Sequence, residues 1–142
     1  MEFTAITQEL LTETQIQSSE FLSELCKATI AMYSNNSATL PWLGYLAQDN
    51  GTFVGTCAFK SPPQNAEVEI AYFTFPQHEG QGVATQMARW LTELAEKNGV
   101  KRVKAQTLPE KNASTRILEK LGFTFVGPTV HPDDGTIWEW QR

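Results

Sequence analysis

Two glycines between a predicted strand and a predicted helix give the sequence its clearest chemical signal. A β-rich run over residues 68–75 ends at Pro76, and Gly80 and Gly82 precede an amphipathic segment that begins at Val83. Glycine lets the backbone approach a ligand closely, and the first amides of a helix lack intrahelical acceptors and lie at the positive end of the helix dipole. The stretch therefore predicts an anion site, for which a diphosphate is the natural ligand.

Three kinds of glycine loop compete for this stretch, and their spacing separates them. A P-loop fits poorly, because it ends in Lys and Ser or Thr and no lysine follows Gly82. A dinucleotide fingerprint requires a third glycine or alanine where Thr85 stands. The third kind is the pyrophosphate loop of the GCN5-related N-acetyltransferases (GNAT), written Gln/Arg-x-x-Gly-x-Gly/Ala. Residues 76–85 closely resemble it, with Gly82 and Ala84 in the two small positions.

The resemblance continues through the second half of the chain. Residues 112–123 are similar to the family's later helix, which ends in a Glu-Lys-Leu-Gly-Phe pattern, particularly in the branch that acetylates ribosomal-protein N-termini. Residues 134–140 resemble the closing strand of that branch. Residues 1–45 match no motif, so the resemblance says least about the choice of substrate.

The resemblance implies both a fold and an activity. The fold is α/β (α+β), one GNAT-like domain over residues 1–142, with a mixed, mostly antiparallel sheet splayed at its centre and flanked by helices. The activity is transfer of an acetyl group from acetyl-CoA directly to a primary amine, on a protein N-terminus or a small molecule, without a covalent enzyme intermediate. The alternative is a catalytically inactive module that binds acyl-CoA or a nucleotide for regulation.

The resemblance also assigns the residues that bind acetyl-CoA. Its diphosphate is expected on the amides of Gly80, Gln81, Gly82, Val83, Ala84 and Thr85. Its amide-rich pantetheine arm is expected along a strand edge at Tyr72, Phe73 and Thr74, with an amide near Thr74 as the oxyanion donor. Ser114 and Asn112 are expected on the later helix, where a helix cap is the alternative role of Asn112.

Glu69 is the candidate general base that accepts the proton of the amine. It lies between aliphatic residues in the predicted strand, where partial desolvation makes a carboxylate a better proton acceptor. Glu67 on the same strand face is the substitute, and the alternative for both carboxylates is an ion pair with basic neighbours. Many family members use a tyrosine as general acid where Leu118 stands here. The thiolate would then leave charged, or take its proton from water or from a hydroxyl such as that of Ser114.

Two further positions depart from the family pattern. Glu79 takes the Gln/Arg position of the loop, which puts a negative side chain near a diphosphate unless it turns to solvent. A second register, with Gln77 in the first position and Gly80 and Gly82 in the small ones, also fits. Lys111 takes the place of an asparagine that the family often has before the later helix.

The remaining sequence predicts the elements that position these residues. Apolar spacing predicts helices over residues 20–32, 83–98 and 113–121. β-rich runs predict strands over residues 42–47, 52–59, 67–75, 100–107, 123–126 and 136–140. Residues 127–134 then form a long hairpin loop in which Asp133 and Asp134 meet a cationic amine, or remain solvated in a turn. Trp138 and Trp140 share one strand face and are expected in the core or at its rim.

Composition limits the partners and the compartment. The net charge of −5, with no basic cluster, argues against nucleic acid as a partner. Cys26 and Cys57 indicate a reducing, cytoplasmic environment, and Cys57 is expected to be a small buried hydrophobe. No apolar run reaches the length of a membrane span, and no metal site is suggested. The expected partner is a small-molecule or peptide amine, and a homodimer is left open.

Overall fold

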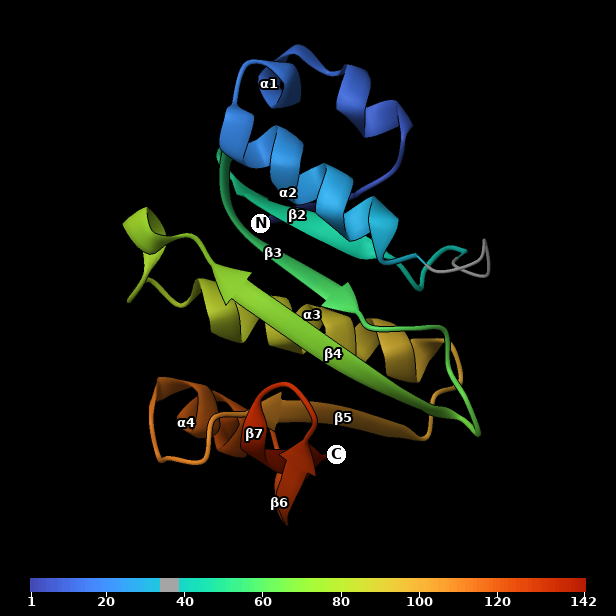
Figure 1. The fold of residues 1–142 in the computed structure, drawn as a ribbon, viewed down its shortest axis with the longest axis vertical. Coiled ribbons are helices and arrows are strands. Elements are labelled where there is room, and N and C mark those ends of the chain that lie inside the picture. Colours follow the sequence, from blue (N-terminus) through green and yellow to red (C-terminus); the bar gives the residue numbers. More distant parts are fainter. Residues whose placement is uncertain (34–38) are drawn as a thin grey trace.

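Seven strands form one sheet in the computed structural model, which describes residues 1–33 and 39–142 (Figure 1). The strands are β1 (Glu2–Ala5), β2 (Gly44–Asp49), β3 (Thr52–Phe59), β4 (Glu67–Thr74), β5 (Arg102–Thr107), β6 (Thr124–His131) and β7 (Gly135–Gln141). The helices are α1 (Thr14–Gln17), α2 (Glu20–Ala31), α3 (Val83–Lys97) and α4 (Ala113–Lys120), with 3-10 turns η1 (Glu9–Thr12) and η3 (Pro76–His78). The strand order is β1-β2-β3-β4-β5-β7-β6. The predicted mixed, mostly antiparallel sheet is confirmed.

The sheet opens between its two central strands. β4 and β5 run parallel, whereas every other neighbouring pair of this sheet is antiparallel. Their pairing extends only from Glu67–Arg102 to Ile70–Ala105, so the second half of β4 has no partner on that side. In Figure 1 the two strands start close together and their arrowheads lie apart. The predicted splay is therefore present.

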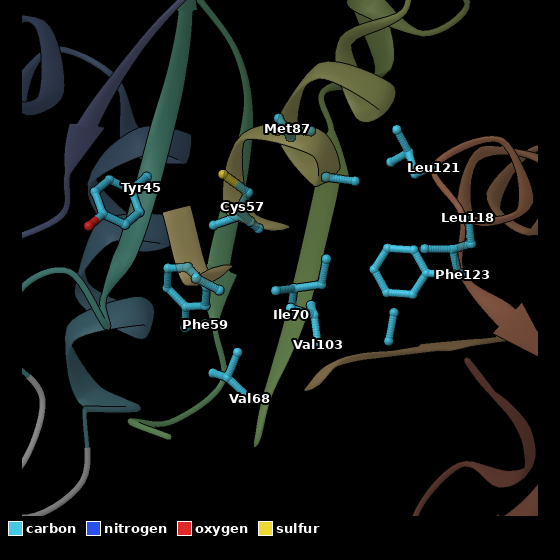
Figure 2. Packing of buried hydrophobic residues seen from close by; sticks show 14 of the residues in the cluster. Tyr45, Cys57, Phe59, Val68, Ile70, Met87, Val103, Leu118, Leu121 and Phe123 are labelled. Atoms are coloured by element: carbon cyan, nitrogen blue, oxygen red, sulfur yellow. The ribbon is translucent and has the colours of Figure 1, made fainter. Parts of the chain in front are cut away.

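Side chains on alternate positions of the strands enter two cores on opposite faces of the sheet. Tyr45 and Ala47 of β2 belong to the core that α3 and α4 cover, whereas Leu46 between them belongs to the core beneath α2. Figure 2 shows the first core, which contains Ile70 of β4 and Met87 of α3. Both of these side chains are almost fully buried, and each such burial contributes about 1.5–3 kcal/mol. The first core fixes α3 against β3 and β4, and the second fixes α2 against β2 on the opposite face of the sheet.

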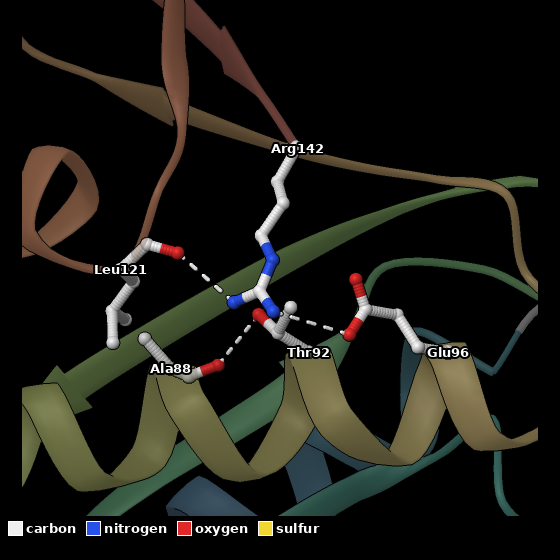
Figure 3. A network of polar contacts seen from close by, with 5 residues as sticks. All are labelled: Ala88, Thr92, Glu96, Leu121 and Arg142. Atoms are coloured by element: carbon white, nitrogen blue, oxygen red, sulfur yellow. Dashed lines mark hydrogen bonds and ion pairs between the residues drawn. The ribbon is translucent and has the colours of Figure 1, made fainter.

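Arg142 links the ends of the two helices on the first face (Figure 3). Its guanidinium donates to the Leu121 carbonyl oxygen at 2.9 Å and contacts Glu96 Oε1 of α3 at 3.3 Å. Because the Arg142 and Glu96 side chains are 35% and 41% exposed, this ion pair contributes at most about 1 kcal/mol. Within α3, the buried Thr92 hydroxyl donates to the Ala88 carbonyl oxygen at 2.7 Å, which satisfies this polar group inside the core.

The predicted helices and most predicted strands match the structure to within about two residues, as expected for such boundaries. The predicted turn between β2 and β3 is confirmed, because Asn50 and Gly51 both have positive φ, 50° and 82°, as a type I′ turn requires. The strand β1, η1 and α1 have no counterpart in the predictions. They are short, and residues 2–17 give no periodic signal strong enough to identify them.

The predicted long loop over residues 127–134 is wrong. β6 continues to His131 and pairs with β7 up to Gly135, so only a tight turn separates the two strands. Gly127 and Pro128 resemble strand breakers in sequence, but β6 lies at the edge of the sheet, where a proline is tolerated and the ladder shifts register between Phe125 and Gly127.

Candidate active site

The N-terminus of α3 presents unpaired backbone amides. Gly82 is its N-cap with φ 80° and ψ 9°, a left-handed conformation that glycine adopts without strain. The first described intrahelical bond runs from the Gln86 amide to the Gly82 carbonyl oxygen at 3.1 Å, so the amides of residues 83–85 have no acceptor within the helix. A Cβ built on Gly80 or Gly82 meets no atom within 4 Å. The loop thus leaves open space directly before a set of free donors.

These donors border a cleft of about 620 Å³ that reaches the splayed part of the sheet. Most of the residues predicted to bind acetyl-CoA line it: Tyr72, Phe73 and Thr74 of β4, Gly80 and Gly82 of the loop, Val83, Ala84 and Thr85 of α3, and Ser114 of α4. Ala113 and Ile117 of α4 complete its far wall. The structure therefore brings the predicted anion site and the predicted strand edge together in one cavity.

The unpaired half of β4 directs backbone groups into this cleft. The Glu69 carbonyl accepts from the Lys60 amide, and the Phe75 amide donates to the Val54 carbonyl, each at 2.9 Å, so both residues face β3. Because successive backbone groups of a strand alternate in direction, Tyr72 and Thr74 face the opposite side, where β5 has diverged. Their amides, and the Tyr72 carbonyl, are thus available to an extended, amide-rich ligand or to an oxyanion.

Two predicted contacts do not line the cleft. Gln81 lies on the exposed side of the loop, and Asn112 caps α4 instead. The Asn112 side chain accepts from the Thr115 amide at 3.2 Å, and the Thr115 hydroxyl accepts from the Asn112 amide at 3.0 Å. Of the two alternatives for Asn112, the structure therefore supports the helix cap.

The Asn112 cap gives a test that separates stability from ligand binding. Asn112→Ala should lower the free energy of unfolding by about 0.5–2 kcal/mol, because the Thr115 amide loses its acceptor. Asn112→Asp, which keeps the acceptor oxygen, should retain most of that stability. Urea unfolding measures the loss, and calorimetry should find the same affinity for acetyl-CoA in all three proteins. Weaker acetyl-CoA binding by a folded Asn112→Ala protein would indicate that Asn112 also contacts acetyl-CoA.

The structure also places the two alternatives for the first position of the glycine motif. Glu79 is exposed at the edge of the cleft, whereas Gln77 lies in η3 and is not among the residues that line it. Gly82 and Ala84, the small positions of the first register, are the N-cap and second residue of α3. Because Glu79 is exposed, its carboxylate can turn away from a bound diphosphate, and solvent then screens its negative charge.

Glu69 and Glu67 both lie in ion pairs on the face of β4 opposite α3. Glu69 Oε2 is 2.6 Å from the Lys60 ammonium, and its side chain is 23% exposed. Glu67 contacts Arg102 at 3.2 Å and Lys104 at 3.7 Å and is 35% exposed. Basic neighbours, one of the alternatives that the sequence left open, are therefore present, and Glu69 is the more enclosed of the two carboxylates. Neither residue lines the large cleft.

Tyr72, which the sequence predicts only as a contact of the pantetheine arm, also carries a hydroxyl. Tyr72 lines the large cleft and also a second cavity on the other side of β4. Burial raises the pKa of Tyr72 to about 12. Leu118, at the position of the family tyrosine, is fully buried in the core and can donate no proton. The position of Tyr72 at the cleft depends on the divergence of β4 from β5, which no local sequence pattern predicts.

Cys57 lines the second cavity but is not equipped as a nucleophile. It is 2% exposed, and burial raises the pKa of its thiol, which therefore stays protonated. This confirms the expectation of a buried hydrophobe. Trp140 is 5% exposed in the core and Trp138 packs against that core, as the sequence also predicted.

Two other kinds of site are not found in the part of the chain that the structure describes. No group of three or more His, Cys, Asp or Glu side chains is arranged to hold a metal ion over residues 1–33 and 39–142. Within those same ranges, no helix combines the length and hydropathy required to cross a bilayer.

Comparison with known proteins identifies the architecture. A family model described as an acetyltransferase (GNAT) domain matches residues 3–124. A spermidine N-acetyltransferase chimera from Vibrio cholerae and hSSAT has a TM-score of 0.74 at 14% identity, covering 99% of this chain and 94% of that one. The ribosomal-protein-alanine N-acetyltransferase from Brucella melitensis has a TM-score of 0.69 at 16% identity, covering 100% and 99%.

A third structure with this fold contains a ligand. A ribosomal L7/L12 alpha-N-protein acetyltransferase in complex with coenzyme A has a TM-score of 0.68 at 17% identity, covering 98% of this chain and 78% of that one. At these identities the similarity establishes the fold. No curated protein sequence matches this one significantly.

Proposed function

The chain belongs to the acetyltransferase (GNAT) domain family, and from that premise we propose that it transfers the acetyl group of acetyl-CoA directly to a primary amine. Proteins of this family use acetyl-CoA as the acetyl donor, and the donor supplies a thioester carbonyl that an amine can attack. The observation that supports the proposal most strongly is the single cleft shared by the free amides of α3 and the unpaired edge of β4.

The residues of the cleft fit the two halves of the donor. The amides of residues 83–85 suit a diphosphate, because they lack intrahelical acceptors and lie at the positive end of a helix dipole. The inward-facing groups of Tyr72 and Thr74 suit an amide-rich arm, which would add to β4 as a short strand does. We assign the Thr74 amide as the donor that stabilises the oxyanion during transfer.

Glu69 is our proposed general base. In the transfer, a bond forms between the amine nitrogen and the carbonyl carbon, the bond from that carbon to sulfur breaks, and the amine loses a proton. Glu69 lies on the side of β4 opposite the large cleft, so it can accept that proton from an amine that approaches through the splay. The Lys60 ammonium fixes the carboxylate at 2.6 Å and must yield as the proton arrives.

Tyr72 is our proposed proton donor to the departing sulfur. Its hydroxyl stays protonated near neutral pH because burial raises its pKa to about 12. The other two described tyrosines use their hydroxyls structurally, since Tyr33 donates to the Ile6 carbonyl at 2.8 Å and Tyr45 to the Pro41 carbonyl at 2.6 Å. No such bond is found for the Tyr72 hydroxyl among the described residues, so it is free to face a ligand.

The role of Tyr72 predicts a moderate loss of turnover. Tyr72→Phe should lower kcat about 10-fold, less than a typical acid catalyst, because a thiol of pKa about 8.5 is already a tolerable leaving group. The affinity for acetyl-CoA should stay within about twofold of wild type, since the ring remains in place. Steady-state thiol release and calorimetry measure the two quantities.

Tyr45→Phe is the matched control for this prediction. Tyr45 is also buried with a pKa raised to about 12, but it does not line the cleft, so its loss should reduce stability and leave kcat unchanged. If Tyr72→Phe turns over like wild type, the thiolate leaves without help from this hydroxyl.

The competing function is a catalytically idle module that binds acyl-CoA. Buried Leu118 at the usual tyrosine position and the Lys60–Glu69 ion pair both favour it. Binding of acetyl-CoA cannot separate the two functions, whereas release of its thiol in the presence of amines can. The acceptor of the proposed reaction is an amine on a small molecule or a protein N-terminus.

A further inference from the structure

A second cavity lies on the side of β4 opposite α3. It has a volume of about 220 Å³ and lies between α2, β3 and β4. Tyr72 and Phe73 line both this cavity and the large cleft, so the two spaces lie on either side of the same splayed segment of β4. Lys60, the ion-pair partner of Glu69, also lines it. An amine in this cavity is therefore close to the proposed base and to the position of the thioester.

The lining of this cavity is mostly apolar, and most of its polar side chains already have hydrogen-bond partners within the protein. Three hydroxyls of the lining already donate to the backbone: Thr29 to the Leu25 carbonyl at 2.9 Å, Thr56 to the Tyr45 carbonyl at 2.9 Å and Tyr33 to the Ile6 carbonyl at 2.8 Å. The Tyr72 side chain packs on the other side of β4, against the first core. Cys57 borders the cavity but adds no polar side chain to it, because its thiol lies in the core on the α3 side of the sheet. The remaining walls include Met32, Ala58 and Ala71. A ligand thus finds few free polar groups inside.

The charge of the lining disfavours a ligand that carries a second positive charge. Among the described residues that line the cavity, the single charged side chain is Lys60, and it is positive. A carboxylate is present only beyond it, where Glu69 holds the Lys60 ammonium. A second ammonium group inside this cavity would be desolvated without a counter-ion, and the cost of such burial is large.

We propose that this cavity binds the body of the acceptor, and that the acceptor is a small monoamine with an uncharged alkyl or aryl body. The inference rests on the proposed transferase function and names its substrate class. The volume of about 220 Å³ is below the roughly 300–1,000 Å³ typical of pockets for drug-sized ligands. One ring or one branched chain fills such a space, with the amine directed at the splay. Polyamines are disfavoured by charge, and extended peptides by size.

Kinetics with three acceptors test the substrate class. 2-Phenylethylamine should show a kcat/KM at least about 10-fold higher than spermidine, because spermidine brings additional positive charges into the cavity. Its kcat/KM should also exceed that of a short peptide with a free alanine N-terminus, because the extended peptide is too large for the cavity. A preference for spermidine overturns the inference and leaves the transferase function intact. A preference for the peptide overturns it in the same way and points to a protein acceptor.

Substitutions at Ala58 test the location. Ala58 lines the second cavity on β3 but not the large cleft. Ala58→Leu should raise the KM for 2-phenylethylamine at least about 10-fold by filling the space, with the KM for acetyl-CoA unchanged. Ala58→Asp should shift the ratio of kcat/KM values toward spermidine at least about 10-fold by supplying the missing counter-charge. Thr52→Asp, at an exposed position of the same strand, is the control for added charge and should change neither value.

A binding measurement separates failure of this inference from failure of the proposed function. Calorimetry with 2-phenylethylamine in the presence of coenzyme A should detect binding to the wild-type protein and none to Ala58→Leu. If that difference is found but no amine is acetylated, the cavity assignment holds and the transferase function is wrong. If both proteins bind the amine equally, or neither binds it, the cavity assignment is wrong, whatever the activity. Unchanged affinity for acetyl-CoA shows that each variant is folded.

Discussion

Gly82→Glu should weaken acetyl-CoA binding at least about 100-fold while the protein remains folded. The change places a carboxylate at the N-cap of α3, next to the amides that we assign to the diphosphate. Two unit charges at about 4 Å and an effective dielectric constant near 20 repel by about 4 kcal/mol, and each 1.4 kcal/mol is a factor of ten in affinity. Calorimetric titration with acetyl-CoA measures the loss directly.

Backbone strain is a second consequence of this substitution and requires its own control. A side chain at φ 80° costs about 1–2 kcal/mol of stability whatever its charge. Gly51→Glu adds the same residue at φ 82° in the β2–β3 turn, where a Cβ also meets no atom within 4 Å. Gly51 does not line the cleft, so this variant should lose similar stability and bind acetyl-CoA normally. Tight binding by a folded Gly82→Glu protein would rule out the loop as the diphosphate site.

Glu69→Gln should lower kcat about 100-fold or more. A positioned general base typically contributes a factor of about 10²–10⁴, and glutamine preserves the shape of the side chain but cannot accept the proton. The affinity for acetyl-CoA should be unchanged, because Glu69 does not line the cofactor cleft. Pre-steady-state and steady-state thiol release with a saturating amine distinguish slow chemistry from weak binding.

Glu67→Gln is the matched control for the base. Glu67 is on the same strand face two positions earlier and pairs with Arg102 and Lys104, contacts that contribute at most about 1 kcal/mol at such exposure. Turnover of this variant should match the wild type. If instead the large loss appears in Glu67→Gln and not in Glu69→Gln, the earlier carboxylate is the base. Two variants with normal turnover would assign the proton to bulk water.

Local sequence predicts the proposed acetyl-CoA side of the site well. Gly80 and Gly82 mark the start of α3, and the strand before them is a continuous β-rich run, so both the free amides and the exposed strand edge follow from neighbouring residues. The structure shows in addition that the free amides and the strand edge face one cavity, because the pairing of β4 with β5 ends at Ile70. Asn112 was ambiguous in sequence for a physical reason: the same amide suits a helix cap and a ligand contact.

The acceptor side depends on contacts that no local pattern contains. Lys60 meets Glu69 because the end of β3 lies beside β4, where the Lys60 amide donates to the Glu69 carbonyl at 2.9 Å. The second cavity lies between α2 and the strands β3 and β4, and no motif in residues 1–45 predicts where α2 lies. β6 was predicted too short because Gly127 and Pro128 act as breakers in isolation but are tolerated in an edge strand.

The most direct test of the central claim is the release of free thiol from acetyl-CoA across a panel of amines, with mass spectrometry of the products. We predict that release depends on the amine, that each turnover yields one singly acetylated amine, and that the protein itself remains unacetylated when the amine is omitted. Gly82→Glu, assayed beside the wild type, should show no release. Binding of acetyl-CoA by the wild-type protein without amine-dependent release on any member of the panel would contradict the account and indicate an idle acyl-CoA-binding module.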